Sequence, residues 1–172
     1  MWPDGPATIQ SPGVRSLSMA QLNVGTVDVY LVDPGPPGWR VLVLQRAPDT
    51  RCPGSWETVH GHIEPGEEPE DAAMREVAEE TGIVVQRLYN VTVQPFYLHR
   101  SHTVELAVVF AAFVDHRDLV TLGPEHVRHA WLSGDAAISR FFWPREQAAL
   151  REIFHLYRTG DGGTAEDVLR IR

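Results

Sequence analysis

Three glutamates crowd beside one arginine in the short segment REVAEETG, residues 75–82. On a helix, Glu76, Glu79 and Glu80 would share one face, because residues three and four apart are neighbours on a helix surface. Two unit charges about 4 Å apart repel by about 4 kcal/mol at the effective dielectric of a protein surface. Such a face is tolerated in two situations. It can be fully solvated, where each like-charged pair costs only about 0.2–0.5 kcal/mol, or it can bind a hard cation that prefers carboxylate oxygens.

Composition narrows the chemistry further. The 172 residues suffice for one well-buried domain but not for two ordinary ones. A formal net charge of −8, without any cluster of basic residues, argues against bulk nucleic-acid binding. All 15 basic residues are arginine, which excludes a Schiff-base lysine and a phosphate-loop lysine. Any anion must therefore be handled by a metal ion or by arginine.

The sequence shows no sign of secretion or membrane insertion. Cys52 is the single cysteine and cannot form an intrachain disulfide. No apolar run near the N-terminus resembles a signal peptide or a membrane span. We therefore expect a cytoplasmic protein that does not bind membranes.

The chain divides into three parts. Residues 1–20 mix Pro, Gly and Ser without a sustained period and predict a loose arm. Residues 21–158 hold the periodic segments and predict one domain, and residues 159–172, rich in Gly and Asp, predict a C-terminal tail. In the domain, TVDVYLVD alternates apolar and polar residues and RVLVLQR follows after PGPPGW, which predicts a hairpin of two strands. The segment SWETVHGHI predicts further extended chain ending at Gly61.

The glutamate segment is predicted to be helical. Pro69 suits a first turn, Glu70 and Asp71 suit the positive end of the helix dipole, and Gly82 suits a left-handed stop. These signals predict a helix over residues 69–81. Its core stripe is predicted to be Ala73, Met74, Val77 and Ala78, with the three glutamates on an adjoining face.

The second half of the domain reads as strands followed by a helix. LYNVTVQPFYLH and the nearly continuous apolar run HTVELAVVFAAFVD predict two paired strands, and EHVRHAWLS predicts a loop running into a short strand. After Pro144, helical spacing of apolar residues predicts a second core helix, carried by Leu150, Ile153, Phe154 and Tyr157. The order of elements favours an α/β (α+β) fold, a mixed β-sheet sandwiched between helices.

Residues 61–83 match a known motif at every position. Gly61, Glu67, the run Arg75-Glu76-Val77, the pair Glu79-Glu80 and the pair Gly82-Ile83 have the spacing of the Nudix box. At background frequencies near 7% per residue type, a chance match of this length is rarer than about one in a million. The chain therefore resembles the Nudix hydrolase superfamily over residues 21–158. The resemblance implies an α/β/α Nudix fold and a Mg²⁺-dependent hydrolase, with Mn²⁺ as a possible substitute.

The resemblance also implies roles for the residues of the box. Glu79 and Glu80 are expected to ligate the metal, with Glu76 as a further ligand or as the base that activates water. The Gly61 carbonyl can reach the same ion, and Arg75 should orient Glu76 through an ion pair. Glu67 is expected to brace the loop before the helix, and Gly82 to act only as a helix stop.

Outside the box, Glu125 is the leading candidate for a downstream metal ligand or base, because several Nudix enzymes carry a glutamate in such a loop. An ordinary loop residue is the alternative, and Glu105 comes second. Arg46 is expected either to meet phosphate oxygens or to form an ordinary ion pair, and His60 is a candidate contact for substrate. No histidine pair has the spacing of a zinc site, so we expect surface or satisfied loop histidines at His60, His62, His126 and His129. Four aromatic residues could sandwich a base or pterin but more often build a core: Trp56, Phe96, Tyr97 and Trp131.

The substrate is open at this point. The segments SWETVHGHIEPGE and AAMREV are similar to those of dihydroneopterin triphosphate pyrophosphohydrolases. We therefore expect cleavage of a diphosphate linkage in a small molecule, such as dihydroneopterin triphosphate, a nucleoside triphosphate or a nucleoside-diphosphate-linked compound. The alternatives are a non-catalytic Nudix module that binds a nucleotide and regulates a partner, and an isopentenyl diphosphate isomerase-like enzyme, which VHGH resembles. A homodimer is compatible with the family.

Overall fold

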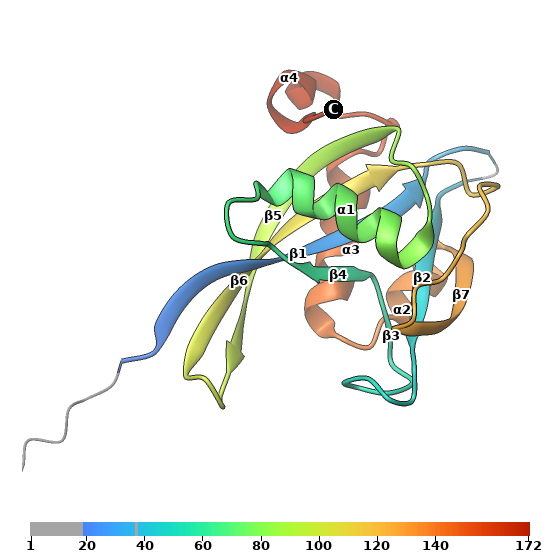
Figure 1. Cartoon of the computed structure of the whole chain (residues 1–172). Coiled ribbons are helices and arrows are strands. Elements are labelled where there is room, and N and C mark those ends of the chain that lie inside the picture. The colour runs from blue at the N-terminus through green and yellow to red at the C-terminus, as the bar shows by residue number, and fades with distance from the viewer. Residues whose placement is uncertain (1–18, 37) are drawn as a thin grey trace, which may run out of the picture.

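The structure is a computed structural model and describes residues 19–36 and 38–172. The predicted arm, residues 1–20, lies outside the described residues up to residue 18. One mixed sheet lies at the centre of the molecule, with helices on both of its faces (Figure 1). The predicted α/β/α sandwich is therefore confirmed.

The central strand β1 (Gln21–Asp33) organises the sheet. The strand order is β3-β2-β1-β6-β5, built from β2 (Arg40–Arg46), β3 (Trp56–Glu57), β5 (Arg87–Leu98) and β6 (Thr103–Phe113). Strand β4 (Val59–His62) pairs with β1, and β7 (His126–Ser133) pairs with β2. The β1–β6 pair is parallel and the others are antiparallel.

The predicted hairpin of β1 and β2 exists, but it is short. Its register joins Val32 to Val41 and Asp33 to Arg40, at the far end of β1. The middle of β1 pairs instead with β4, in a register that joins Thr26 to His62 and Asp28 to His60. This split of β1 between two partners places the Gly61 segment beside the middle of the sheet.

Two apolar layers enclose the sheet. Because side chains alternate along a strand, Val27, Val29 and Leu31 of β1 face one layer, while Tyr30 and Val32 face the other. Helix α1 (Pro69–Thr81) covers the first layer, and α3 (Pro144–Leu156) covers the second (Figure 1). The predicted core residues of α3 are buried at Leu150, Ile153 and Tyr157, and Phe154 packs partly buried against them.

Helix α1 has the predicted bounds, because its local signals are strong. Pro lies in its first turn, and Gly82 ends it with a φ of 68°, which favours glycine. The predicted core stripe is wrong in one place, since Ala78 is exposed while Glu80 and Thr81 are buried. The helix is rotated on the sheet so that its inward stripe contains one of the glutamates.

Three short helical segments complete the secondary structure of the described residues. These are α2 (Gly134–Arg140), the 3-10 turn η1 (Gly163–Ala165) and α4 (Glu166–Leu169). The C-terminal tail returns to the sheet, where Ile171 N donates to Leu88 O at 2.8 Å and Arg172 pairs with Asp71 of α1. None of the helices in the described part of the chain is long and apolar enough to cross a membrane.

Candidate active site

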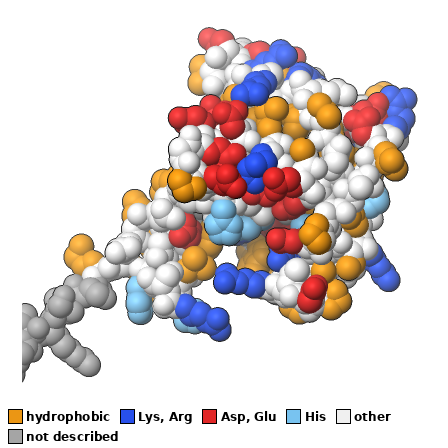
Figure 2. Space-filling view, in the orientation of Figure 1, with side chains coloured by type: hydrophobic (Ala, Val, Ile, Leu, Met, Phe, Trp, Pro, Cys, Tyr) orange, Lys and Arg blue, Asp and Glu red, His pale blue; other side chains and the backbone are white. Residues whose placement is uncertain are grey.

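Arg75 lies at the centre of the acidic face of α1. Figure 2 shows acidic side chains gathered around a basic one on this face of the molecule. The Arg75 guanidinium donates two hydrogen bonds to the Glu67 carboxylate, each at 3.0 Å, and one to Glu76 at 2.8 Å. It also donates to the His62 carbonyl at 2.8 Å. A planar guanidinium can hold all of these acceptors at once, so Arg75 ties the loop before α1 to Glu76.

Gly61 and Glu76 are packed against each other. A Cβ atom added at Gly61 would lie 2.0 Å from Glu76 Cδ, a distance that no side chain tolerates. The absence of a side chain at position 61 therefore lets the Glu76 carboxylate lie directly over β4. The same approach brings the backbone of Gly61 beside the acidic face of α1.

Glu80 is the buried member of the three glutamates. It retains 7% of its accessible surface, whereas the Glu79 side chain is 60% exposed. Glu80 Oε2 has no hydrogen-bond partner among the described residues. Burial raises the pKa of Glu80 to about 9, and the charges of Glu76, Glu57 and Glu125 add to the shift. A buried carboxylate with an unused oxygen is a group that a cation would stabilise.

Behind Glu80 lies a second group that joins β2, β3 and the loop before β7. Arg46 donates to Glu57 at 3.1 Å and to Glu125 at 2.9 Å. His126 is buried, with Nε2 at 3.5 Å from Glu57 and Nδ1 at 3.6 Å from Glu80. Within the part of the chain that the structure describes, neither ring nitrogen makes a hydrogen bond. The expectation that His126 is a surface or satisfied histidine is therefore wrong.

No signal in the sequence points to Glu57. It belongs to the two-residue strand β3 and reaches the site only because β3 pairs with the end of β2, where Leu44 faces Glu57. For His126, the adjacent Glu125 is the one available hint. Both residues are brought to Glu80 by long-range strand pairing, which local patterns do not reveal.

A cavity of about 310 Å³ collects most of the predicted site residues. Its lining includes Arg46, Arg51, His60, Gly61, His62, Glu76, Glu79, Glu80, Gly123, Pro124 and Glu125. Figure 2 shows histidine side chains directly below the acidic cluster, at the edge of a hollow in this face. Arg75 is not part of this lining. The cavity thus combines convergent carboxylates, which can hold a hard cation, with arginine side chains that can meet phosphate oxygens.

The remaining candidates lie elsewhere. Glu105 is buried and accepts hydrogen bonds from Asn23, at 3.1 and 2.9 Å, outside the cavity lining. Trp131 packs against the core layer under α1, and Tyr97 is exposed. Phe96 is outside the cavity lining, and its ring centroid lies 6.3 Å from that of His60. The aromatic residues therefore form no sandwich around the glutamates.

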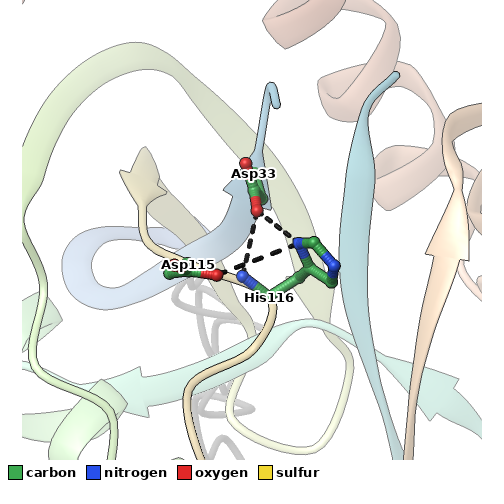
Figure 3. A group of neighbouring side chains, drawn as sticks. All are labelled: Asp33, Asp115 and His116. Carbon is green, nitrogen blue, oxygen red and sulfur yellow. Dashed lines mark hydrogen bonds and ion pairs between the residues drawn. The ribbon is translucent and has the colours of Figure 1, made fainter. Parts of the chain in front are cut away.

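A second group of metal-ligand side chains lies at the other end of β1 (Figure 3). Ligand atoms of Asp33, Asp115 and His116 all lie within 4.8 Å of one another. Asp33 Oδ2 accepts hydrogen bonds from the His116 backbone at 3.0 Å and from its Nδ1 at 2.5 Å, while Oδ1 accepts from Gly35. Asp115 is bound by Arg117 in the same way. These carboxylate oxygens already accept hydrogen bonds from protein groups. The group therefore connects the end of β1 to the chain that follows β6.

Comparisons with known proteins agree with this geometry. The model of the family described as NUDIX domain matches residues 22–153. An octanoyltransferase of Myxococcus xanthus is 33% identical over 117 residues, which cover 67% of this chain and 32% of that protein. The dihydroneopterin triphosphate diphosphatase of Escherichia coli K12 is 32% identical over 123 residues, covering 63% of this chain and 79% of that protein. The solved structure of the E. coli dihydroneopterin triphosphate pyrophosphohydrolase is 26% identical with a TM-score of 0.61, covering 78% of this chain and 97% of that one.

Proposed function

The chain belongs to the NUDIX domain family, and on this premise we propose that it is a Mg²⁺-dependent pyrophosphohydrolase that cleaves a diphosphate linkage in a small molecule. The observation that carries this proposal is the cavity of the box glutamates, with a buried Glu80 oxygen that has no hydrogen-bond partner among the described residues. We assign the activity to the domain formed by residues 21–158. The chain spans only 32% of the length of the octanoyltransferase that it matches, so the activity of that protein is not assigned to this chain.

The donor set fits a hard divalent cation. Glu79 and Glu80 would be metal ligands, together with the Gly61 carbonyl, and Mn²⁺ could replace Mg²⁺ because both accept oxygen ligands. When bound, the ion would polarise a phosphoryl oxygen, lower the pKa of a water molecule and offset the mutual repulsion of the glutamates. A net charge of −8 would otherwise repel an anionic substrate.

The protein groups around the ligands would position and activate water. Glu76 would be a further ligand or the base that takes a proton from water, and its contact with Arg75 fixes its carboxylate. Glu125 would play one of the same two roles from the opposite wall, held by Arg46 at 2.9 Å. Because Arg46 is already paired with two carboxylates, we propose that it positions Glu125 in addition to meeting phosphate oxygens.

The substrate class that we propose is a triphosphate or diphosphate-linked small molecule, with dihydroneopterin triphosphate and nucleoside triphosphates as the leading candidates. Support comes from the similarity to the E. coli dihydroneopterin triphosphate diphosphatase and from the cavity, whose volume of about 310 Å³ accommodates a diphosphate and part of its organic group.

The test is a substrate panel in millimolar Mg²⁺. It contains nucleoside triphosphates, dihydroneopterin triphosphate, nucleotide sugars, ADP-ribose and dinucleoside polyphosphates. Phosphate release is measured with and without added pyrophosphatase and phosphatase, so that release of pyrophosphate is distinguished from release of phosphate and from exposure of a monophosphate. Each substrate is run with wild type, with Glu80→Gln and with Glu70→Gln, a control that changes an acidic residue in the first turn of the same helix.

We expect turnover that requires Mg²⁺, falls by orders of magnitude in Glu80→Gln and persists in Glu70→Gln. Tight binding of a nucleotide without turnover would overturn the proposal and favour a regulatory module. Equal rates for wild type and Glu80→Gln would show that the protein is a hydrolase but that the glutamates are not needed for turnover.

A further inference from the structure

A buried carboxylate lies directly behind one wall of the cavity. Asp28 is on β1, has no accessible surface, and accepts a hydrogen bond from His60 Nδ1 at 2.6 Å. Its other oxygen accepts a hydrogen bond from Arg145, in the first turn of α3. The register of β1 and β4 places Asp28 opposite His60, so three separate elements meet at one carboxylate.

Burying a charge at this position costs free energy that must be offset. Burial by itself would raise the pKa of Asp28, but the hydrogen bond from His60 and the charge of Arg145 lower it below the ordinary value. Asp28 is therefore an anion, and Arg145 is the permanent cation that neutralises it. A buried ion pair is weak support for stability, since apolar residues of similar volume often serve as well or better. The consequence of the pair lies instead in the residue that shares it, His60.

The third member, His60, faces the cavity. Its side chain is 26% exposed, and it is part of the lining that also contains Glu76 and Glu80. A neutral imidazole carries one proton, and the nitrogen that contacts a carboxylate must hold it. The contact with Asp28 therefore places the proton on Nδ1. Nε2, which has no hydrogen-bond partner in the described residues 19–36 and 38–172, becomes an acceptor.

Phe96 restricts the ring further. Its centroid lies 6.3 Å from that of His60, and the Arg145 guanidinium lies 5.0 Å from the Phe96 ring on the same side of the sheet. A lone acceptor nitrogen in the cavity lining suits an organic group that carries hydrogen-bond donors. A phosphate oxygen, which is itself an acceptor, does not suit a lone acceptor.

We propose that Asp28 and Arg145 are positioning residues that hold His60 with its proton on Nδ1, so that Nε2 accepts a hydrogen bond from an O–H or N–H group on the non-phosphate part of the substrate. The selection of substrate rests on the proposed function, whereas the placement of the proton does not. His60 would then recognise the organic group of the substrate, next to the glutamates that act on the diphosphate.

Asp28→Asn inverts this arrangement. Arg145 has only donors, so the amide oxygen of Asn must face it and the amide nitrogen must face His60. The amide would then donate to Nδ1, and the proton of His60 would move to Nε2. The chain supplies a matched control in Asp33→Asn, because Asp33 holds His116 through Nδ1 in the same way, at the far end of β1.

The first measurement is NMR of ¹⁵N-labelled protein without metal, in which long-range ¹H–¹⁵N correlations distinguish the two neutral forms of each imidazole. The signals of His60 are those lost in His60→Gln. We expect the Nδ1–H form in wild type and in Asp33→Asn, and the Nε2–H form in Asp28→Asn. An Nε2–H form in wild type would overturn the proposal without any variant, so a variant that fails to fold does not remove the test.

The second measurement compares the best substrate of the panel with tripolyphosphate, which has no organic group. We expect Asp28→Asn to raise KM for the organic substrate about tenfold, with little change in kcat, because a donor would then face a donor. The inhibition constant of tripolyphosphate should not change, and Asp33→Asn should change neither value. Equal effects of Asp28→Asn on both compounds would show a structural role only and overturn the selection. If no panel compound is hydrolysed, the proposed function fails, while the NMR result still decides where the proton lies.

Discussion

Glu80→Gln should stabilise the metal-free protein while it abolishes function. The native carboxyl of Glu80 has a pKa of about 9, mainly because it is buried, whereas the unfolded chain has the ordinary value of 4.5. At pH 7 the native protein therefore keeps a proton that the unfolded chain releases. The difference of 2.5 pH units between 7 and 4.5 corresponds to about 3 kcal/mol of lost stability. Glutamine has nearly the same shape and does not ionise. Glu80→Gln therefore removes this destabilisation.

The expected effect depends on pH in a fixed direction. Because the pKa of Glu80 is raised on folding, the destabilisation that Glu80 causes without metal is absent below pH 4.5 and grows as pH rises towards 9. The advantage of Glu80→Gln should be small near pH 5, about 3 kcal/mol at pH 7 and larger still at pH 8.5. For a domain of this size, about 3 kcal/mol corresponds to roughly 6–12 °C in Tm.

The assay is urea unfolding followed by tryptophan fluorescence, in EDTA, at pH 5, 7 and 8.5. Glu79→Gln is the matched control, because its side chain is 60% exposed and its replacement should change stability by less than about 0.5 kcal/mol. Added Mg²⁺ should then stabilise wild type more than Glu80→Gln, through binding to the native state alone. A Glu80→Gln variant no more stable than wild type at pH 7 and pH 8.5 would refute the reasoning that Glu80 is a buried, uncompensated acid.

Three further predictions concern the same cavity. Gly61→Ala places a Cβ 2.0 Å from Glu76 Cδ, so Mg²⁺ affinity measured by calorimetry should fall at least about tenfold; unchanged affinity would show that the position of Glu76 is not needed. Arg75→Lys keeps the charge but loses the double hydrogen bond to Glu67, so kcat should fall about 10–100-fold. The control Arg151→Lys, on the exposed side of α3, should leave kcat unchanged. Chelation by EDTA should remove turnover and excess Mg²⁺ or Mn²⁺ should restore it; hydrolysis that continues in EDTA would contradict the assigned role of the glutamates.

The sequence by itself determined the elements whose signals are local. Pro69 and Gly82 marked both ends of α1, because a proline in the first turn and a left-handed glycine act through their own backbone. Alternation along β1 and the helical spacing of α3 predicted a two-faced sheet with helices on each face. The spacing of the box from Gly61 to Ile83 placed the chain in its family, because that spacing is set within one loop and one helix.

Only the tertiary structure decided how these elements face one another. Helical spacing allowed Ala78 to point inward, but the rotation of α1 on the sheet buried Glu80 instead. Long-range strand pairing brought Glu57 to His126, which also contacts Glu80, and the pairing of β1 with β4 placed Asp28 opposite His60. These contacts depend on the relative positions of elements far apart in the chain. Periodicity within a segment reveals which residues share a face, but what that face meets is decided only when the segments pack together.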